Sequence, residues 1–365
     1  MIEIKRGTIV QQIFSRPGIE AYWLKLGETE ERCIVYPHLV GEVAPGDEVL
    51  VNTTAQTLNL GSGGYHYVIA NLRNQGCPLP PGGHIMKLRY TPLQLKVMSV
   101  EEEDSPYHEI MRAADSLDGI PVLVGTLHSM LAPLCLRLHA WGYRVAYVMT
   151  DGAALPAHLS ETAAWLKESG QLLGTVTAGH AFGGDLEAVN VYSGLLAARK
   201  VLQADVIVVC MGPGIVGTGT RWGFSGVEQG EILNAAEALG GTPVAVPRIS
   251  FADTRERHRG ISHHTLTVLS RVCRVNAVVP LPELEEDKMS CVLQQLQDAG
   301  LFSRHHICLE PVYGFADWLK EQPRDFTTMG RGVNEDREFF LALGAAACSA
   351  RRLLKGEKLA RVWPA

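Results

Sequence analysis

Residues 251–264 hold the densest set of side chains in the sequence that could do chemistry. The arginines suit a phosphate or a carboxylate, because a guanidinium group donates paired hydrogen bonds to such anions. The histidines suit acid–base catalysis, because their ordinary pKa lies near neutrality. We expect an anion site with acid–base groups; the alternative is a solvated loop tied by salt bridges. The candidate residues are Asp253, Arg255, Arg257, His258, His263 and His264.

The spacing of His258 and His263 would also allow a bound divalent metal ion. The two imidazoles are five positions apart, and Asp151, Asp185 or Asp253 could add oxygen ligands. No HExxH motif or comparable zinc signature accompanies them. A divalent metal is therefore an open alternative, for which the sequence predicts no complete ligand set.

A glycine-rich stretch, residues 212–226, follows a predicted apolar strand. Glycines let backbone amides turn toward an anion, and the start of the following helix adds positive potential. Hydroxyl groups and a guanidinium group in the stretch could complete a cradle for phosphate or carboxylate. The alternative is a loop whose glycines serve close packing alone. The candidate ligand-binding residues are Gly212, Gly214, Gly217, Thr218, Gly219, Thr220 and Arg221.

The first part of this stretch, residues 212–217, matches the spacing G-x-G-x-x-G. In dinucleotide-binding proteins that pattern opens a helix at once, and an acidic residue follows about 20 positions later. Here more glycines precede the helix, and the next predicted strand ends at Arg248 and Ser250 without such an acid. A nicotinamide dinucleotide is therefore the less favoured cofactor, and the sequence contains no P-loop motif.

Four further candidates follow predicted strands and would supply or orient an acid–base group. Their structural alternatives are a buried histidine, a turn-forming aspartate or a helix N-cap. Ser225 and Glu228 match a capping box at the start of the next helix. The four candidates are His128, Asp151, His180 and Asp185.

These candidates share a location if the chain forms a doubly wound α/β domain. After Pro106, apolar strands alternate with helical patterns, as in a mostly parallel sheet with helices on both faces. Ligands bind beyond the carboxyl ends of such strands, so five consecutive loops would meet at one edge. The predicted strands are 120–125, 144–149, 172–178, 205–211, 242–250, 276–280 and 306–309. The predicted helices include 129–141, 158–169, 187–202, 229–239, 262–272, 283–299 and 335–354.

The first part of the chain has a different pattern. Short strands separated by turns rich in Gly and Pro predict a small β-barrel or a β-sandwich-like domain. The composition changes near the acidic residues 101–105. We therefore expect two domains: a β-rich N-terminal domain over residues 1–100 and an α/β domain over residues 101–365.

The composition excludes several classes of protein. Of the 365 residues, 46% are hydrophobic and the net charge is −6, which argues against nucleic acid or an anionic membrane as partner. No apolar run approaches the roughly 20 residues of a membrane helix, and the first residues lack the apolar core of a signal peptide. Eight scattered cysteines without a CxxC pair suit a reducing compartment. We expect a cytoplasmic protein, with a homodimer as the commonest oligomer.

Four elements together are similar to an uncharacterised bacterial family, the domain of unknown function 3866. They are residues 52–55 (NTTA), the turn 61–66, the loop 211–230 and residues 261–264 (ISHH). The resemblance covers nearly the whole chain. It implies no activity, cofactor or catalytic residue.

The favoured hypothesis is an enzyme that acts on a small anionic metabolite, such as a phosphorylated one, by hydrolysis or group transfer. The alternatives are an NAD(P)-dependent oxidoreductase and a non-catalytic ligand-binding or assembly protein. Because such folds host many functions, the choice among these hypotheses depends on the residues of the loops and not on the fold. The candidate acid–base groups are His128, His180, His258 and His263, with Asp151 or Asp185 as orienting group or base.

Overall fold

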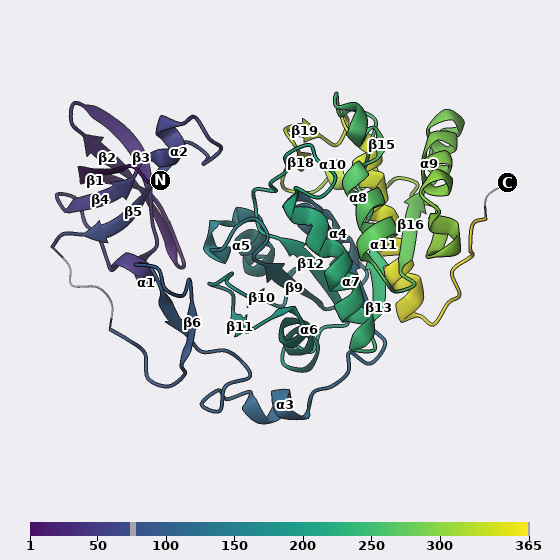
Figure 1. The fold of residues 1–365 in the computed structure, drawn as a ribbon, viewed down its shortest axis with the longest axis horizontal. Helices are drawn as coiled ribbons and strands as arrows, with labels where there is room; N and C mark the ends of the chain where they lie inside the picture. Colours follow the sequence, from purple (N-terminus) through teal and green to yellow (C-terminus); the bar gives the residue numbers. More distant parts are fainter. Residues whose placement is uncertain (74–77, 364–365) are drawn as a thin grey trace. The chain divides into compact units, whose positions relative to one another are not determined.

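The computed structural model describes residues 1–73 and 78–363. By its internal contacts the chain divides into two compact units, Met1–Val97 and Met98–Ala365 (Figure 1). One hydrophobic cluster fills the smaller unit, and two clusters fill the larger one. Each unit is described by itself below.

The smaller unit is a closed barrel of five strands in the order β1-β2-β3-β5-β4 (Figure 1). Side chains of a strand point alternately to its two faces, so along β2 Leu24 is buried whereas Trp23 and Lys25 are exposed. The prediction of a small β-barrel is confirmed. The elements are β1 (Ile4–Arg16), β2 (Ile19–Leu26), β3 (Thr29–Val35), α1 (Pro37–Val40), β4 (Glu48–Asn52), α2 (Thr54–Thr57), β5 (Tyr65–Asn71) and the hairpin β6 (Ile85–Lys87) and β7 (Leu95–Val97).

The larger unit contains an eight-stranded parallel sheet in the order β11-β10-β9-β12-β8-β13-β16-β17. β12 (Val206–Met211) is buried along its whole length, as expected for a strand covered on both faces. The prediction of a doubly wound, parallel α/β fold is confirmed. The other strands of the sheet are β8 (Pro121–Val124), β9 (Val145–Thr150), β10 (Thr175–Ala178), β11 (Leu186–Ala188), β13 (Thr242–Ala245), β16 (Val278–Pro282) and β17 (His306–Glu310).

Helices cover both faces of this sheet. Cys210 of β12 packs into the core shared with α4 (Leu131–Ala140), whereas its neighbour Val209 packs into the core shared with α7 (Glu228–Ala238). None of the helices formed by the described residues is long and apolar enough to span a lipid bilayer. The other helices are α3 (His108–Ala113), α5 (Glu161–Glu168), α6 (Val191–Lys200), α8 (His263–Thr267), α9 (Glu286–Asp298), α10 (Phe315–Lys320) and α11 (Arg337–Leu354).

The neighbouring strands β8 and β12 form the switch point of the sheet. α4 follows β8 on one face, and α7 follows β12 on the other. Ligands of doubly wound proteins bind at such a point, beyond the carboxyl ends of the strands, because the two connections diverge there. The loops that flank it are residues 125–130 and 212–227.

The sequence prediction is wrong around β11. This short strand occupies the start of the predicted helix 187–202, and α6 begins only after its N-cap Asn190. β11 runs parallel to β10, so residues 179–185 return to the amino end of the sheet. Asp185 therefore lies at that end, not at the carboxyl edge, and it caps no helix.

The contacts of Asp185 agree with this position. Its Oδ2 accepts a hydrogen bond from the N–H of Thr175, the first residue of β10, over 2.9 Å. Its other oxygen pairs with Lys167 of α5. Asp185 is thus far along the strand from the loops that carry the remaining candidates.

The predicted strand 242–250 is divided in the structure. β13 ends at Ala245, and β14 (Ile249–Ser250) pairs antiparallel with β15 (Gly260–Ile261) outside the main sheet. This hairpin folds residues 251–259 back on themselves. It brings the end of that loop to the start of α8, which continues as a π-helical turn over Val268–Val272.

Candidate functional site

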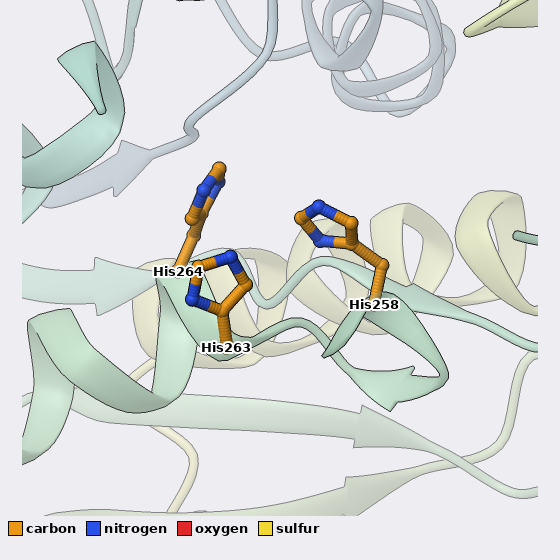
Figure 2. A group of neighbouring side chains, drawn as sticks. All are labelled: His258, His263 and His264. Atoms are coloured by element: carbon orange, nitrogen blue, oxygen red, sulfur yellow. The ribbon is translucent and has the colours of Figure 1, made fainter. Parts of the chain in front are cut away.

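Three histidines come together where the β14–β15 loop meets α8 (Figure 2). His258 ends a 3-10 turn in the loop, and His263 and His264 are the first two residues of α8. One ring nitrogen of each lies within 4.8 Å of the other two. Figure 2 shows His258 reaching toward the other two rings from a separate stretch of backbone. We call these three residues the histidine cluster.

Ser262 orients the histidine cluster. Its Oγ accepts a hydrogen bond from the N–H of His264 over 3.3 Å, which caps α8. The same oxygen lies 2.8 Å from Nδ1 of His258. If it accepts from an Nδ1–H there as well, Nε2 of His258 keeps a free lone pair. One hydroxyl group thus contacts both the first turn of α8 and the ring of His258.

Two ring nitrogens of the cluster are buried without a hydrogen-bond partner among the described residues, Nε2 of His263 and Nδ1 of His264. His264 is only 5% exposed. Burial lowers the pKa of His258 and of His264 to about 3, and nearby cationic groups contribute. Burial and nearby arginines also lower the pKa of His263. At neutral pH the three rings are therefore uncharged, the form that binds metal ions.

The histidine cluster contacts the glycine-rich stretch. The ring of Phe224 stacks on that of His264, with centroids 3.9 Å apart and planes inclined by 3°. A Cβ at Gly217 would lie 3.6 Å from Cε1 of His264, so the backbone passes close beside the imidazole. A Cβ at Gly226 would lie 3.4 Å from Cβ of Thr126, just beyond β8. These contacts connect the cluster to the switch point of the sheet.

A buried carboxylate, Asp253, holds the loop that carries His258. It accepts hydrogen bonds from Arg248 over 3.0 Å and from Nε and Nη2 of Arg255 over 2.9 and 2.8 Å. The Arg255 guanidinium group holds the pKa of Asp253 well below its usual range. Arg331, which is paired with Asp336 at 2.9 Å, lies 3.6 Å from the same carboxylate. The charges of Asp253 and Arg255 are thus engaged in a structural network, which gives no support to a direct role in catalysis or ligand binding.

Arg257 differs from these arginines. Its side chain is exposed, and it forms no ion pair with any residue that the structure describes. A Cβ at Gly219 would lie 3.7 Å from Cζ of Arg257, so the guanidinium group lies against the glycine-rich stretch. Its charge also contributes to the lowered pKa of His263 and His264. Arg257 is therefore an unpaired cation beside the histidine cluster.

The glycine-rich stretch forms a hairpin rather than an open cradle. Gly217 and Phe224 face each other in an antiparallel bridge, and the N–H of Thr218 donates to the carbonyl of Gly223 over 2.8 Å. The hydroxyl groups of Thr218 and Thr220 lie 3.0 Å apart, and that of Thr220 accepts from the N–H of Gly223. These hydroxyl groups serve the hairpin itself, so the structure gives no support to a cradle built from them.

The remaining predicted residues of the stretch have mixed roles. A Cβ at Gly212 would lie 2.5 Å from Cε of Met149, so this glycine is needed for close packing. Gly214 has φ +101°, a backbone conformation that glycine adopts at turns, and open space beside it. Arg221 is exposed. None of the three is brought into contact with the histidine cluster by the interactions of the described residues.

Two carboxylates lie at the carboxyl ends of β9 and β10. Asp151 accepts a hydrogen bond from the backbone N–H of His180 over 2.8 Å and so connects the two strand ends. Glu228, the first residue of α7, accepts one from the hydroxyl group of Thr150 over 2.5 Å. Burial raises the pKa of Glu228 to about 7, and the charge of Asp151 adds to the rise.

Sequence analysis missed Glu228 as a functional candidate, because its spacing from Ser225 fits a capping box. In the structure the hydroxyl group of Ser225 instead accepts a hydrogen bond from the N–H of Val216 over 3.0 Å. The available signal was an acidic residue directly after a glycine-rich loop at the carboxyl edge of a parallel sheet.

His128 connects two elements of the larger unit. Its Nε2 lies 2.8 Å from Oγ of Ser160, the N-cap of α5, and its Nδ1 lies 3.4 Å from the hydroxyl group of Tyr147. Burial lowers its pKa to about 4. His128 is half-buried, and both of its ring nitrogens contact protein groups, which favours a structural role.

A pocket of about 930 Å³ lies beside the same loop, but the histidine cluster does not line it. Phe251 and Arg259 line it together with the starts of α9 and α11. Five acidic and three basic side chains line this pocket, and its Lys288 pairs with Glu285 and Glu338. An excess of acidic groups makes it a poor site for an anion.

Comparison with known proteins agrees with the resemblance expected from the sequence. The model of one family, described as protein of unknown function (DUF3866), matches residues 32–347. No curated protein matches the chain at a significant level. Because the match spans most of the sequence, the chain belongs to the DUF3866 family.

Proposed function

We propose that this protein is an enzyme that binds a small anionic substrate beside the histidine cluster and acts on it by hydrolysis or group transfer. The position of Arg257 carries the proposal. Its guanidinium group is unpaired among the described residues, and it lies against Gly219 and close to uncharged imidazoles. An unpaired guanidinium group suits a phosphate or carboxylate, because it can donate two parallel hydrogen bonds.

Glu228 is our candidate for proton transfer at this edge of the sheet. An acid–base group works best when its pKa lies near the working pH. The pKa of Glu228, raised by burial to about 7, meets that condition, and Thr150 orients the carboxyl group. The histidines of the cluster are less suited to donate a proton, because they are uncharged at neutral pH.

The geometry gives no support to the dinucleotide alternative. Residues 212–217 lead into the hairpin and not directly into a helix, and α7 starts only at Glu228. The dinucleotide fingerprint needs the helix at once, so that its N-terminus meets the pyrophosphate.

The other alternative is a non-catalytic sensor. Binding of an anion without turnover would favour it over an enzyme.

We also propose that the protein works in the cytoplasm. The seven cysteines among the described residues are free thiols, and five of them are buried. Unpaired thiols suit a reducing compartment. Cell fractionation would test this, and light scattering of the purified protein would test the expected homodimer.

Titration calorimetry with inorganic phosphate and with citrate tests the anion site, and a screen of phosphate and carboxylate esters tests turnover. We expect Arg257→Ala to weaken binding at least tenfold, about 1.4 kcal/mol. Arg221→Ala, which removes an exposed arginine of the glycine-rich hairpin, is the matched control and should change binding less than twofold. Equal losses in the two variants, or none in Arg257→Ala, would contradict the proposed site.

A further inference from the structure

We propose that the histidine cluster is a binding site for a transition metal ion, Zn²⁺ above all. His258, His263 and His264 would be its three protein ligands, and one coordination position would stay open. The metal site does not depend on the proposed substrate, because it follows from the three rings alone.

The geometry of the cluster suits such an ion. Zinc–imidazole bonds are about 2.0–2.1 Å long, so tetrahedral ligand atoms lie roughly 3.4 Å apart. The three ring nitrogens are within 4.8 Å of one another. The nitrogens would therefore have to close by about 1.4 Å at most, and side-chain rotations of less than about 30° stay within a rotamer well.

The unpaired ring nitrogens point to a ligand. Nε2 of His263 and Nδ1 of His264 are buried and have no hydrogen-bond partner among the described residues. Buried polar atoms in proteins nearly always have a partner, and an exception calls for water or an ion. A water molecule donates only two hydrogen bonds, whereas a metal ion accepts the lone pairs of all three rings.

Ser262 gives the cluster the support that metal ligands need. A histidine that binds a metal through one nitrogen usually donates a hydrogen bond from the other, which fixes the tautomer and the ring orientation. Nδ1 of His258 lies 2.8 Å from Oγ of Ser262, so an Nδ1–H that donates to this oxygen would leave Nε2 for the ion. Phe224, stacked on His264, fixes the plane of a second ring.

The ligand set selects the class of metal. Uncharged imidazoles suit Zn²⁺ and its neighbours among the transition metals, whereas Mg²⁺ and Ca²⁺ prefer oxygen ligands. Among the described residues the group contains only histidines. Three protein ligands are typical of catalytic zinc sites, because structural sites are closed by a fourth.

The surrounding charges place an anion next to the open position. Arg248 and Arg255 would repel a cation, but both are paired with Asp253. Arg257 is unpaired among the described residues and can hold an anionic group beside the ion. The negative charge of that anionic ligand would then offset the positive charges of the metal ion and Arg257.

The metal would also supply the nucleophile for the proposed hydrolysis, a step that rests on the proposed function. A zinc-bound water would lose its proton to solvent near neutral pH. The hydroxide oxygen would form a bond to the phosphorus or carbonyl carbon of the substrate. The bond to the leaving group breaks, and the leaving group keeps the electron pair and takes up a proton.

Elemental analysis tests the metal site directly. Full-length protein without an affinity tag would be treated with EDTA, loaded with Zn²⁺ and desalted. We expect about one zinc per chain, falling to a tenth or less in His258→Ala and in His264→Ala. His139→Ala, which removes an exposed histidine of α4, is the matched control and should keep the zinc.

A second measurement needs no variant, in case the alanine substitutions unfold the protein. Titration of the EDTA-treated wild type with Co²⁺ should produce the visible absorption of a tetrahedral site and saturate at one equivalent. Zinc well below one per chain together with no Co²⁺ spectrum would overturn the metal site, as would unchanged zinc in a folded His258→Ala variant. Phosphate titrations of the EDTA-treated protein separate the two proposals: zinc without phosphate binding leaves the metal site standing, and phosphate without zinc binding refutes it.

Discussion

The glycine-rich hairpin and the histidine cluster lie in contact, yet their polar atoms are used in opposite ways. In the hairpin, the hydroxyl groups of Thr218 and Thr220 and the N–H of Gly223 bond one another. In the cluster, ring nitrogens of His263 and His264 are buried without a partner among the described residues. A buried polar atom left unpaired costs about 1–3 kcal/mol. The contrast is the reason why we propose the ligand site at the cluster and not in the hairpin.

The largest expected effect is a loss of stability when the buried carboxylate that holds the loop of His258 is removed. Asp253→Ala removes the carboxylate that faces Arg248, whose side chain is 3% exposed. Leaving a buried guanidinium group without its partner costs about 3–5 kcal/mol. We expect the free energy of unfolding in urea to fall by that amount.

Asp317→Ala is the matched control for this experiment. Asp317 forms an exposed ion pair with Lys320 at 2.8 Å. Exposed pairs contribute little, so we expect no measurable change in the free energy of unfolding. If Asp253→Ala cost no more than this control, the loop of His258 would not be held by buried charges.

The second effect depends on pH and concerns Glu228. Its carboxyl pKa is raised to about 7 in the folded protein, chiefly by burial, so ionisation is less favourable there than in the unfolded chain. Wild-type stability should therefore fall as pH rises from about 4.5 to about 7, by about 2–3 kcal/mol. Glu228→Gln cannot ionise and should be more stable than wild type by this amount at pH 8, but by only about 1 kcal/mol or less at pH 5.

Urea unfolding at the two pH values measures this difference. Glu231→Gln, an exposed position about one turn further along α7, should show little pH dependence of its effect. A stability difference between Glu228→Gln and wild type that is the same at pH 5 and pH 8 would contradict the raised pKa.

The third effect concerns Ser262 and distinguishes its role as a helix cap from its role in orienting His258. Ser262→Ala removes the cap of α8 and the partner of His258, so we expect a loss of about 1 kcal/mol of stability. Zinc affinity should fall about 10–100-fold, as for other groups that orient metal ligands. Ser160→Ala removes the cap of α5 and should cost similar stability with no change in zinc affinity. Equal zinc affinities in the two variants would show that Ser262 only caps the helix.

The smallest effect is expected in the hairpin. Replacing both Thr218 and Thr220 by alanine removes exposed hydroxyl groups that contact only the hairpin. We expect a loss of about 0.5 kcal/mol or less and a phosphate affinity within twofold of wild type. A tenfold loss of phosphate affinity would restore the hairpin hydroxyl groups as an anion cradle and break the comparison.

The sequence predicts the core of the sheet better than its edge. β12 is a continuous run of buried apolar residues, which is typical of a central parallel strand. β11 has only three residues and is followed at once by a helical pattern, so its strand character is hidden. That single omission puts Asp185 at the wrong end of the sheet, because the chain must reverse before a parallel strand.

The candidate site is predictable in its residues but not in their contacts. Each histidine of the cluster is a candidate by type, but their meeting depends on the β14–β15 hairpin, which joins strands of two residues each. Arg255 and Arg257 are two positions apart and chemically equal, yet Asp253 engages only Arg255. The backbone geometry of the loop determines which of the two arginines stays unpaired, and the sequence pattern does not predict that geometry.

Diffraction from crystals of the zinc-loaded protein tests the central claim most directly. Anomalous difference maps above and below the zinc edge would locate the ion without any substitution. The account predicts one strong peak about 2.1 Å from a nitrogen of each of His258, His263 and His264. Three ordered rings with no peak between them, or zinc held only by other residues, would contradict it.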